Sequence, residues 1–507
     1  MAPTVKCAAG EFRGATAAGA DSWKGIRYAL APTGELRWRA PRASPPVVAD
    51  ALAFGPAAPQ IANPAIKLGD GIRIDEDCLF LNVWRPADRT GESLPVMVWI
   101  HGGAYALGSG SQPLYDATSL AATHGIVVVT INYRLGALGF LDLTAFSSDE
   151  TPFDGNLALR DILLALEWVR DNVAAFGGDP ARVTVAGESA GGGLVTALLA
   201  CPAANGLYSR AIIESSPASS IYGLARAEAI ARRFLDRVDV TPDAVASLRD
   251  LAVDRIVQAG MAVYAEVPAA APGTLAFAPV VDGDLLPEPP IDVIREGRGM
   301  PVPLLIGTNE NEASLFKFMR SPLMPIAETE IMRMFTDLHA EQPNLELPPR
   351  ERVLSAYADE RPRARGLAVA RDIAFRLPAL WVAEGHSRVA DTWLYRFDRA
   401  TPIMRLLGIG ATHAAELPYV WGNLGGRGNP AFRLGGRRVA TMASARTQAR
   451  WAAFIRGGRP EAPNAIEWPK YTDETRTTLV IDRVDKAVPD LDAAMRGAWG
   501  DETIAFR

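Results

Sequence analysis

Cysteine is scarce in this chain of 507 residues, which contains only Cys7, Cys78 and Cys201. So few thiols exclude a framework of several disulfides, and no two of them have the Cys-x-x-Cys spacing of a zinc or redox site. One thiol must stay unpaired even if the other two form a bridge. The sequence therefore predicts a protein of a reducing compartment, the cytoplasm. No cluster of His, Cys and carboxylate residues suggests a metal site, so we expect neither a metal ion nor a cofactor.

Positive charge and long apolar runs are also in short supply. Lys and Arg total 52 against 58 Asp and Glu, a net charge of −6. Nucleic acids and anionic membranes bind basic faces, so neither is expected as a partner. The stretch 93–115 carries no charged side chain, but His101-Gly102-Gly103 interrupts it, which predicts a buried strand and a loop instead of a membrane span. No secretory signal is expected either, because charged residues from Lys6 to Arg13 interrupt any apolar segment there.

Internal repeats are lacking. The composition and the alternation of strand and helix patterns are typical of a globular α/β protein. Hydrophobic residues make up 49% and charged residues 22% of the chain, which excludes disorder for most of it. Helical patterns at 156–172 and 190–200 alternate with short apolar runs, so helices are expected on both faces of a mostly parallel sheet. In such sheets the ligand lies beyond the carboxyl ends of the strands. The predicted strands are Leu79–Trp84, Pro95–Ile100, Ile126–Asn132, Val183–Ala186, Ala211–Glu214, Pro303–Gly307 and Trp393–Phe397.

The length of the chain allows several domains of about 150 residues, or one enlarged α/β domain with insertions. We expect a single domain over residues 1–507, because the strand and helix patterns continue along most of it. Two segments, about 225–264 and 314–387, are helical, charged and poor in strands. They are expected to be helical insertions that cap the active site. The last clear helix is predicted at 441–456, before a weak pair of strands.

A candidate nucleophile stands at Ser189, in the pattern Gly187-x-Ser189-x-Gly191. The β-rich Val-Thr-Val precedes the pattern and an apolar helix follows it, which is the context of a nucleophile elbow. Such a sharp turn exposes the serine Oγ above the sheet, and glycines flank it because side chains there would collide with neighbouring elements. The alternative is an ordinary Gly/Ser turn. Glu188, beside the serine, either tunes the electrostatics of the site or is a buried, hydrogen-bonded carboxylate.

A second glycine-rich turn, His101-Gly102-Gly103-Ala104, follows the strand 95–100. Backbone N–H groups can point at a developing oxyanion only where no bulky side chain intervenes, so this loop is a candidate oxyanion hole. We assign the donors to Gly103, Ala104 and Ala190, the residue after the candidate nucleophile. The alternative is a plain glycine turn. The loop also supplies candidate residues of the substrate pocket: Gly102, Tyr105 and Leu107.

A serine nucleophile needs a base and an orienting acid. Where an elbow of this kind is used, both follow the serine along the chain, which leaves His339, His386 and His413 as candidate bases. The first two lie on polar helical stretches and are expected to be solvated, whereas His413 lies in a loop after a strand. For the acid, pattern alone does not separate Glu310 from Glu312, in the polar loop after strand 303–307. Asp282 is the chief rival, although it precedes Gly283 as turn residues often do.

Three motifs together resemble the type B carboxylesterases, the cholinesterase-like family of α/β-hydrolases, and its bacterial members in particular. They are Gly187-Glu188-Ser189-Ala190-Gly191-Gly192, Glu76–Val83 and Asn132-Tyr133-Arg134-Leu135-Gly136. The resemblance runs from Gly25 to at least Asn423 and implies the α/β-hydrolase fold. The family's acid is a Glu five residues after the Gly that ends a strand, here Glu312 after Gly307. Its base is the His of His-x-x-Glu-Leu-Pro, here His413, and its oxyanion donors correspond to Gly103, Ala104 and Ala190.

The resemblance implies a serine hydrolase that cleaves carboxylic esters through an acyl-serine, without metal or cofactor. The expected substrates are small to medium apolar esters, and the expected state is a monomer or a weak homo-oligomer. Hydrolysis of amides or carbamates by the same residues is one alternative. A non-catalytic binding protein of the same fold is another, although the nucleophile, acid, base and oxyanion glycines are all retained.

Three departures from the family pattern carry expectations of their own. Ala313 stands where the family usually has Gly after the acid, and a positive φ there would strain it. Cys78 matches a half-cystine of secreted members, but the region of its usual partner, 55–63, contains no cysteine, so Cys78 is expected to be a buried thiol. No cholinesterase-like tryptophan precedes Cys78, so a choline ester is not implied as the substrate.

Overall fold

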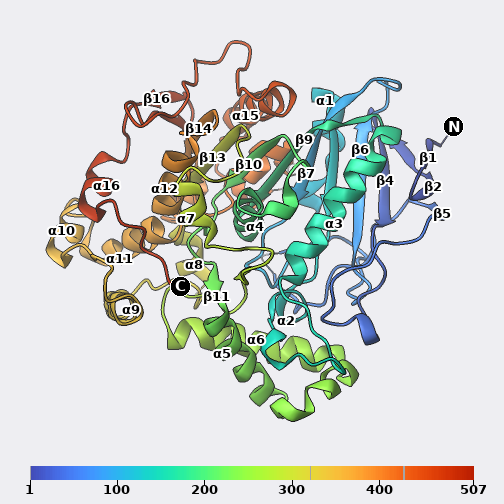
Figure 1. Cartoon of the computed structure of the whole chain (residues 1–507). Coiled ribbons are helices and arrows are strands. Elements are labelled where there is room, and N and C mark those ends of the chain that lie inside the picture. Colours follow the sequence, from blue (N-terminus) through green and yellow to red (C-terminus); the bar gives the residue numbers. More distant parts are fainter. Residues whose placement is uncertain (1, 65, 320, 426–428) are drawn as a thin grey trace.

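A large mixed β-sheet runs through the computed structural model, which describes residues 2–64, 66–319, 321–425 and 429–507 (Figure 1). Eleven strands belong to this sheet among the described residues. The strands from β15 to β8 pair in parallel, and antiparallel strands flank them at both edges. Their spatial order is β16 (Lys486–Val488), β15 (Thr478–Ile481), β14 (Thr392–Phe397), β13 (Leu304–Asn309), β10 (Arg210–Glu214), β9 (Gly178–Glu188), β7 (Leu94–Ile100), β8 (Val127–Ile131), β6 (Phe80–Pro86), β4 (Ala20–Arg27) and β3 (Ala15–Ala17).

All seven strands predicted from apolar runs are present, but one of them differs in direction. The predicted strand Leu79–Trp84 is β6, which is antiparallel to both β4 and β8. Its residues 81–84 are fully buried, as in the parallel strands, so the apolar pattern carried no information about direction. A separate sheet of β1 (Thr4–Cys7), β2 (Gly10–Arg13) and β5 (Val47–Asp50) lies near the N-terminus, where no strand was predicted.

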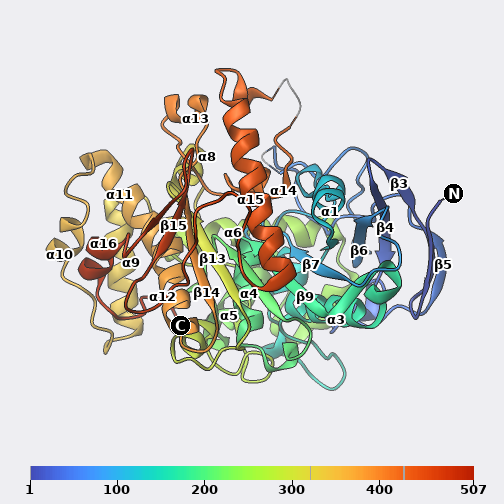
Figure 2. The ribbon, with the colours of Figure 1, turned by 90° about the horizontal axis from the view of Figure 1, so that it is seen from above.

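Helices cover both faces of the large sheet, as expected (Figures 1 and 2). In β7, Val96, Val98 and Ile100 join the core on one face, whereas Met97 and Trp99 join the core on the other. A strand buried on both faces needs apolar side chains at every position, which explains its continuous apolar run. The helices packed on the first face are α3 (Leu157–Asn172), α4 (Ala190–Leu199) and α12 (Leu377–His386). Those on the second are α1 (Thr118–His124), α14 (Leu417–Trp421) and α15 (Arg437–Gly457).

The two strand-poor segments are helical. Most of residues 225–264 belong to three helices: α5 (Leu224–Arg237), a 3-10 helix (Pro242–Asp250) and α6 (Val253–Ala270). Residues 314–387, of which Arg320 lies outside the described residues, contain most of α8 (Ala313–Met319), then α9 (Glu328–Glu341), α10 (Arg350–Ser355), α11 (Pro362–Arg371), a π-helical turn (Asp372–Arg376) and α12. The last helix is α16 (Ala493–Trp499), so the prediction that 441–456 is the last clear helix was wrong. The remaining helices are α2 (Gly136–Phe140), α7 (Pro290–Arg295) and α13 (Pro402–Leu406).

Two negative expectations can be compared with this fold. Within the part of the chain that the structure describes, no helix has both the length and the apolar character needed to cross a bilayer. The three cysteines are all free, and Cys78 is buried as a thiol, as expected. Burial raises the pKa of Cys78, so this thiol stays protonated.

Candidate active site

Ser189 lies in a sharp turn between β9 and α4, at the carboxyl edge of the parallel strands. Its backbone angles are φ 57° and ψ −123°, a conformation that L-residues rarely adopt and that is typical of a nucleophile elbow. A Cβ on Gly191 would lie 2.0 Å from the carbonyl oxygen of Ile100, and one on Gly187 would lie 2.6 Å from the carbonyl carbon of Gly191. Only glycine therefore fits on either side of Ser189. The Ser189 N–H donates to the carbonyl oxygen of Glu214 at 2.9 Å, which ties the turn to β10.

The structure brings Ser189, His413 and Glu312 together in one hydrogen-bonded chain. His413 Nε2 lies 2.8 Å from Ser189 Oγ, and His413 Nδ1 lies 2.6 Å from Glu312 Oε2. Glu312 is fully buried in the loop after β13, and His413 is 8% exposed in the loop before α14. Ser189 and His413 are 224 residues apart in sequence, and the fold brings them together because their loops lie at the same edge of the sheet.

The loops that carry Glu312 and His413 are fixed to each other and to the sheet. The Asn311 N–H donates to the carbonyl oxygen of Ala411 at 2.8 Å, and Ser314 Oγ donates to Thr412 Oγ1 at 2.8 Å. The other oxygen of Glu312, Oε1, accepts from Ser215 Oγ and from the Asn309 N–H, both at 2.6 Å. The carboxylate is thus held in one orientation, with Oε2 aimed at the imidazole.

The rival acids and bases lie elsewhere. Asp282 Oδ2 accepts from Asn156 Nδ2 at 2.8 Å, and its other oxygen accepts from backbone N–H groups of its own turn. The Glu310 N–H donates to the carbonyl oxygen of Phe397 at 2.9 Å, and burial, followed by the charge of Asp398, raises the pKa of the Glu310 carboxyl group. His339 is exposed, as expected. The prediction that His386 is solvated was wrong: α12 packs against α7, His386 is buried, and its Nε2 lies 2.7 Å from the carbonyl oxygen of Val302.

The candidate oxyanion loop lies against the elbow. Gly103, Ala104 and Tyr105 all have positive φ values (126°, 52° and 61°), so the backbone turns continuously over three residues. A Cβ on Gly103 would lie 2.0 Å from the carbonyl oxygen of Leu107, and one on Gly102 would lie 3.1 Å from Ser189 Cβ. The flat glycine backbone is therefore what lets this loop approach the nucleophile. Ala313, by contrast, does not have a positive φ and begins α8, so the strain considered for it does not arise.

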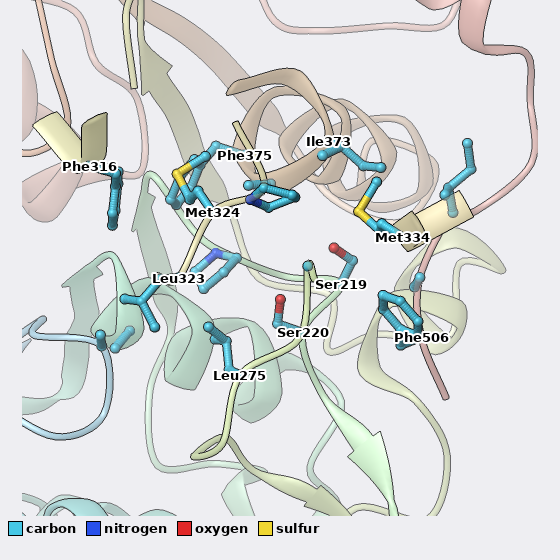
Figure 3. Close-up of a pocket in the computed structure, with 18 of the residues that line it drawn as sticks. Ser219, Ser220, Leu275, Phe316, Leu323, Met324, Met334, Ile373, Phe375 and Phe506 are labelled. Atoms are coloured by element: carbon cyan, nitrogen blue, oxygen red, sulfur yellow. The ribbon is translucent and has the colours of Figure 1, made fainter. Parts of the chain in front are cut away.

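A mostly apolar cavity of about 90 Å³ opens beside Ser189 (Figure 3). Ala104, Tyr105 and Ala190 line it, whereas Gly102 and Leu107, two of the three expected pocket residues, are not among its lining residues. Phe316 and Phe375 line it next to the base, with ring centroids 5.1 and 4.8 Å from that of His413. The segment 314–387 supplies much of the wall, whereas none of the described residues 225–264 lines it. The other lining residues are Pro217, Ser219, Ser220, Gly273, Leu275, Leu323, Met324, Pro325, Met334, Leu338, Ile373, Ala374, Ile504, Ala505 and Phe506.

Comparison with known proteins assigns the family. A model described as "Carboxylesterase family" matches residues 1–497. The chain belongs to the carboxylesterase family. This carboxylesterase is 39% identical over 482 residues to para-nitrobenzyl esterase of Bacillus subtilis, with 93% of each chain covered. It is 33% identical over 505 residues to phenmedipham hydrolase of Pseudarthrobacter oxydans, covering 94% of this chain and 95% of that relative.

Solved structures agree with that assignment. A PNB esterase matches the carboxylesterase with a TM-score of 0.84 at 36% identity, covering 99% of this chain and 100% of the other. A thermophilic PNB esterase matches with a TM-score of 0.86 at 35% identity and the same coverage. These findings confirm the family and the α/β-hydrolase fold predicted from the sequence. They also confirm the predicted activity: the protein hydrolyses carboxylic esters.

Buried glutamates surround the candidate catalytic residues of the carboxylesterase. Glu188 Oε1 lies 3.3 Å from His413 Nε2, and burial, then the charges of Glu312 and Glu214, raise the pKa of Glu188 well above its ordinary range. Glu416 Oε2 accepts from Asn309 Nδ2 at 2.6 Å, and burial raises its pKa as well. Sequence reasoning named Glu188 but missed Glu416 and Glu214, as well as Ser215 and Asn309. Two signals in the sequence could have identified the missed glutamates: the His-x-x-Glu spacing for Glu416, and the position of Glu214 at the end of the strand 211–214.

Glu214 makes the stability of the protein depend on pH. Burial raises its pKa from 4.5 to about 8, although Trp451 Nε1 donates to it at 2.7 Å. Between these values the unfolded chain releases a proton that the folded protein keeps, so the unfolding free energy falls as pH rises. We expect Glu214→Gln to remove the part of this loss that Glu214 contributes, which is at most about 1.4 kcal/mol per pH unit. Urea unfolding at about pH 5 and pH 8 measures it.

Glu150→Gln is the matched control for this experiment, because Glu150 is exposed. It should leave the difference between the two pH values unchanged. If wild type and Glu214→Gln lost stability in parallel as pH rises, Glu214 would be ionised in the folded protein, and the account of its burial would be wrong.

Proposed function

We propose that the chain is a single α/β-hydrolase domain in which Ser189 is the nucleophile, His413 the general base and Glu312 the orienting acid. The observation that carries this proposal is the hydrogen-bonded chain from Ser189 Oγ through His413 to Glu312, with contacts of 2.8 and 2.6 Å. Each partner is also within the distance that proton transfer or orientation of the imidazole requires. The proposed donors to the oxyanion are the backbone N–H groups of Gly103, Ala104 and Ala190.

The chemistry follows from these roles. Ser189 Oγ attacks the ester carbonyl carbon while its proton passes to His413 Nε2, and the N–H donors hold the resulting oxyanion. Glu312 accepts the Nδ1–H, which fixes the imidazole tautomer and stabilises the imidazolium. His413 then gives its proton to the alcohol oxygen as the carbon–oxygen bond breaks, leaving an acyl-serine. Water then gives a proton to His413 Nε2 and its oxygen attacks the acyl carbon. The bond from that carbon to Ser189 Oγ breaks, His413 returns the proton to Oγ, and the acid is released.

The size and lining of the cavity favour small to medium apolar esters. The cavity beside Ser189 has a volume of about 90 Å³. Phe, Leu, Ile and Met side chains dominate its wall, and methionine adapts to ligands of different shape.

The test of the proposed function compares matched esters and amides. We expect phenyl acetate and phenyl butyrate to be hydrolysed with a kcat/KM at least about 10³-fold above that of the corresponding anilides, because an anilide nitrogen must be protonated in order to leave. Hydrolysis of anilides at a comparable rate would favour the amidase alternative. Absence of turnover with every ester would contradict the proposal.

Ala104 should restrict esters of tertiary alcohols. Its Cβ belongs to the cavity wall that also contains Ser189 and Ala190, and its φ of 52° suits glycine. We expect slow hydrolysis of tert-butyl acetate by wild type and a gain of about 10-fold or more in kcat/KM for Ala104→Gly. Phenyl acetate should change little, because removal of a methyl group relieves a clash only for a bulky alcohol. Equal gains on both esters would instead indicate a change in donor geometry.

We also propose that the enzyme acts in the reducing cytoplasm as a monomer or weak homo-oligomer. In support, Cys78 and Cys201 are buried and free, and Cys7 is half-buried and free. Burial raises the pKa of each thiol, which keeps it protonated and unreactive.

A further inference from the structure

The catalytic cavity has two ends. In Figure 3, Phe316 and Phe375 lie at one end, and these are the rings that pack against His413. Met334 and Phe506 lie at the opposite end, with Ser219 and Ser220 between the two groups. The side chains at this second end are thus different from those that pack against His413.

The far end is tightly packed. Phe506 is 4% and Met334 is 2% exposed. Gly273 lies against both: a Cβ built on it would lie 2.5 Å from Met334 Sδ and 3.5 Å from Phe506 Cε2. Gly273 also has a φ of +86°, which favours glycine. These contacts close the cavity with a thioether, an aromatic ring and a bare backbone, and they present no charge to its interior.

Phe506 is held in place from outside the cavity. The guanidinium of Arg226 lies 5.0 Å from the ring centroid of Phe506 and 5.0 Å from that of Tyr222. Arg226 is also paired with Glu341, at the end of α9. A guanidinium stacked against an aromatic ring is attracted by the π-system, so this contact limits the positions that Phe506 can take.

The segment that carries Phe506 is anchored on both sides of the ring. Arg295 Nη1 donates to Thr503 Oγ1 at 2.5 Å, and Gln342 Nε2 donates to the carbonyl oxygen of Ala505 at 2.6 Å. Arg507 Nη2 donates to Asp292 Oδ1 at 2.9 Å. These hydrogen bonds hold residues 504–506, which line the cavity, in place.

We propose that Phe506 closes a distal subsite for the longer apolar chain of the ester and so determines the chain length that the enzyme accepts. This proposal rests on the proposed function, because the subsite is distal only with respect to an ester carbonyl that reacts at Ser189. Phe506 lies outside residues 1–497, the part matched by the family model, so that match assigns it no role. The ligand class is an ester with an unbranched alkyl or aryl chain, since Phe506 and Met334 present an aromatic ring and a thioether at this end.

The test is a chain-length profile of Phe506→Ala and Phe506→Leu. Two substrate series are used: p-nitrophenyl esters of acids from acetate to decanoate, and acetates of alcohols from methanol to octanol. Each buried methylene is worth about fourfold in kcat/KM, so we expect the ratio of long to short substrates to rise about 10-fold or more in Phe506→Ala. The rise should occur in one series, which identifies the acyl or the alcohol chain as the occupant. Phe506→Leu should show a smaller rise in the same series.

Phe335→Ala is the matched control. Phe335 neighbours Met334 on α9 but packs on Trp499, with ring centroids 5.9 Å apart, and is not among the residues lining the cavity. It should leave the profile unchanged. Unchanged profiles in both Phe506 variants, or an equal shift in Phe335→Ala, would overturn the length determinant while acetate hydrolysis still supported the proposed function. If the wild-type enzyme did not hydrolyse the acetate esters, the proposed function itself would be refuted. If Phe506→Ala fails to fold, Phe506→Leu decides the question.

Discussion

Ser189→Ala and His413→Ala should each lower kcat for phenyl acetate by about 10⁴-fold or more. Ser189→Ala removes the atom that bonds to the acyl carbon. His413→Ala removes the base 2.8 Å from that atom, so the hydroxyl keeps its proton during attack. Because the two residues act as one unit, the double variant should be no slower than either single variant. Steady-state kinetics with circular dichroism as a check of folding measure this.

His339→Ala is the control for the histidine variant. Its side chain is exposed on α9, so kcat should stay within about twofold of wild type. A His413→Ala enzyme that kept more than about a tenth of the wild-type kcat would contradict the assignment of the base.

Glu312→Gln should lower kcat by about 10²–10⁴-fold, less than either variant above. The amide keeps the size of the side chain but lacks the charge that stabilises the imidazolium. In wild type the carboxylate accepts hydrogen bonds from His413 Nδ1, Ser215 Oγ and the Asn309 N–H. The NH₂ group of glutamine is a donor, so it would face another donor on one side of the side chain and lose that hydrogen bond. The imidazole is then no longer held in the tautomer that accepts the Ser189 proton.

Glu310→Gln and Asp282→Asn are the controls for the acid. Glu310 is two residues away on the same loop, and Asp282 is hydrogen-bonded to Asn156, away from the base. Both variants should keep kcat close to the wild-type value. Full activity of Glu312→Gln together with inactive Asp282→Asn would require a different acid.

The central sheet was predictable because a strand buried on both faces must be apolar at every position, as 96–100 in β7 shows. The antiparallel direction of β6 was not, since burial on both faces leaves the same pattern in either direction. The small sheet of β1, β2 and β5 was missed because its strands are short and partly exposed, so few apolar residues mark them. Helix α16 escaped notice for a related reason: only three of its seven residues are buried.

The candidate site divides in the same way. Ser189 and the oxyanion loop were identifiable from the sequence because glycines occupy the positions beside them where a side chain would collide with the backbone. Pattern left Glu310 and Glu312 equivalent, and only the resemblance to a family chose between them. Ser215, Asn309 and Phe506 were not predicted, because their positions beside Glu312 or the cavity depend on packing between segments far apart in the sequence. His386 was misjudged because its helix is polar in part yet packs on α7 and the sheet.

Labelling with a fluorophosphonate tests the identity of the nucleophile most directly. The probe's phosphorus is attacked by an activated serine, fluoride leaves, and a stable adduct remains that resembles the tetrahedral intermediate. The account predicts loss of esterase activity in step with one adduct per chain, found by mass spectrometry on Ser189. It also predicts much slower labelling of His413→Ala. An inactivated enzyme with its adduct on another residue, or an active enzyme that takes up no label, would contradict the assignment of Ser189.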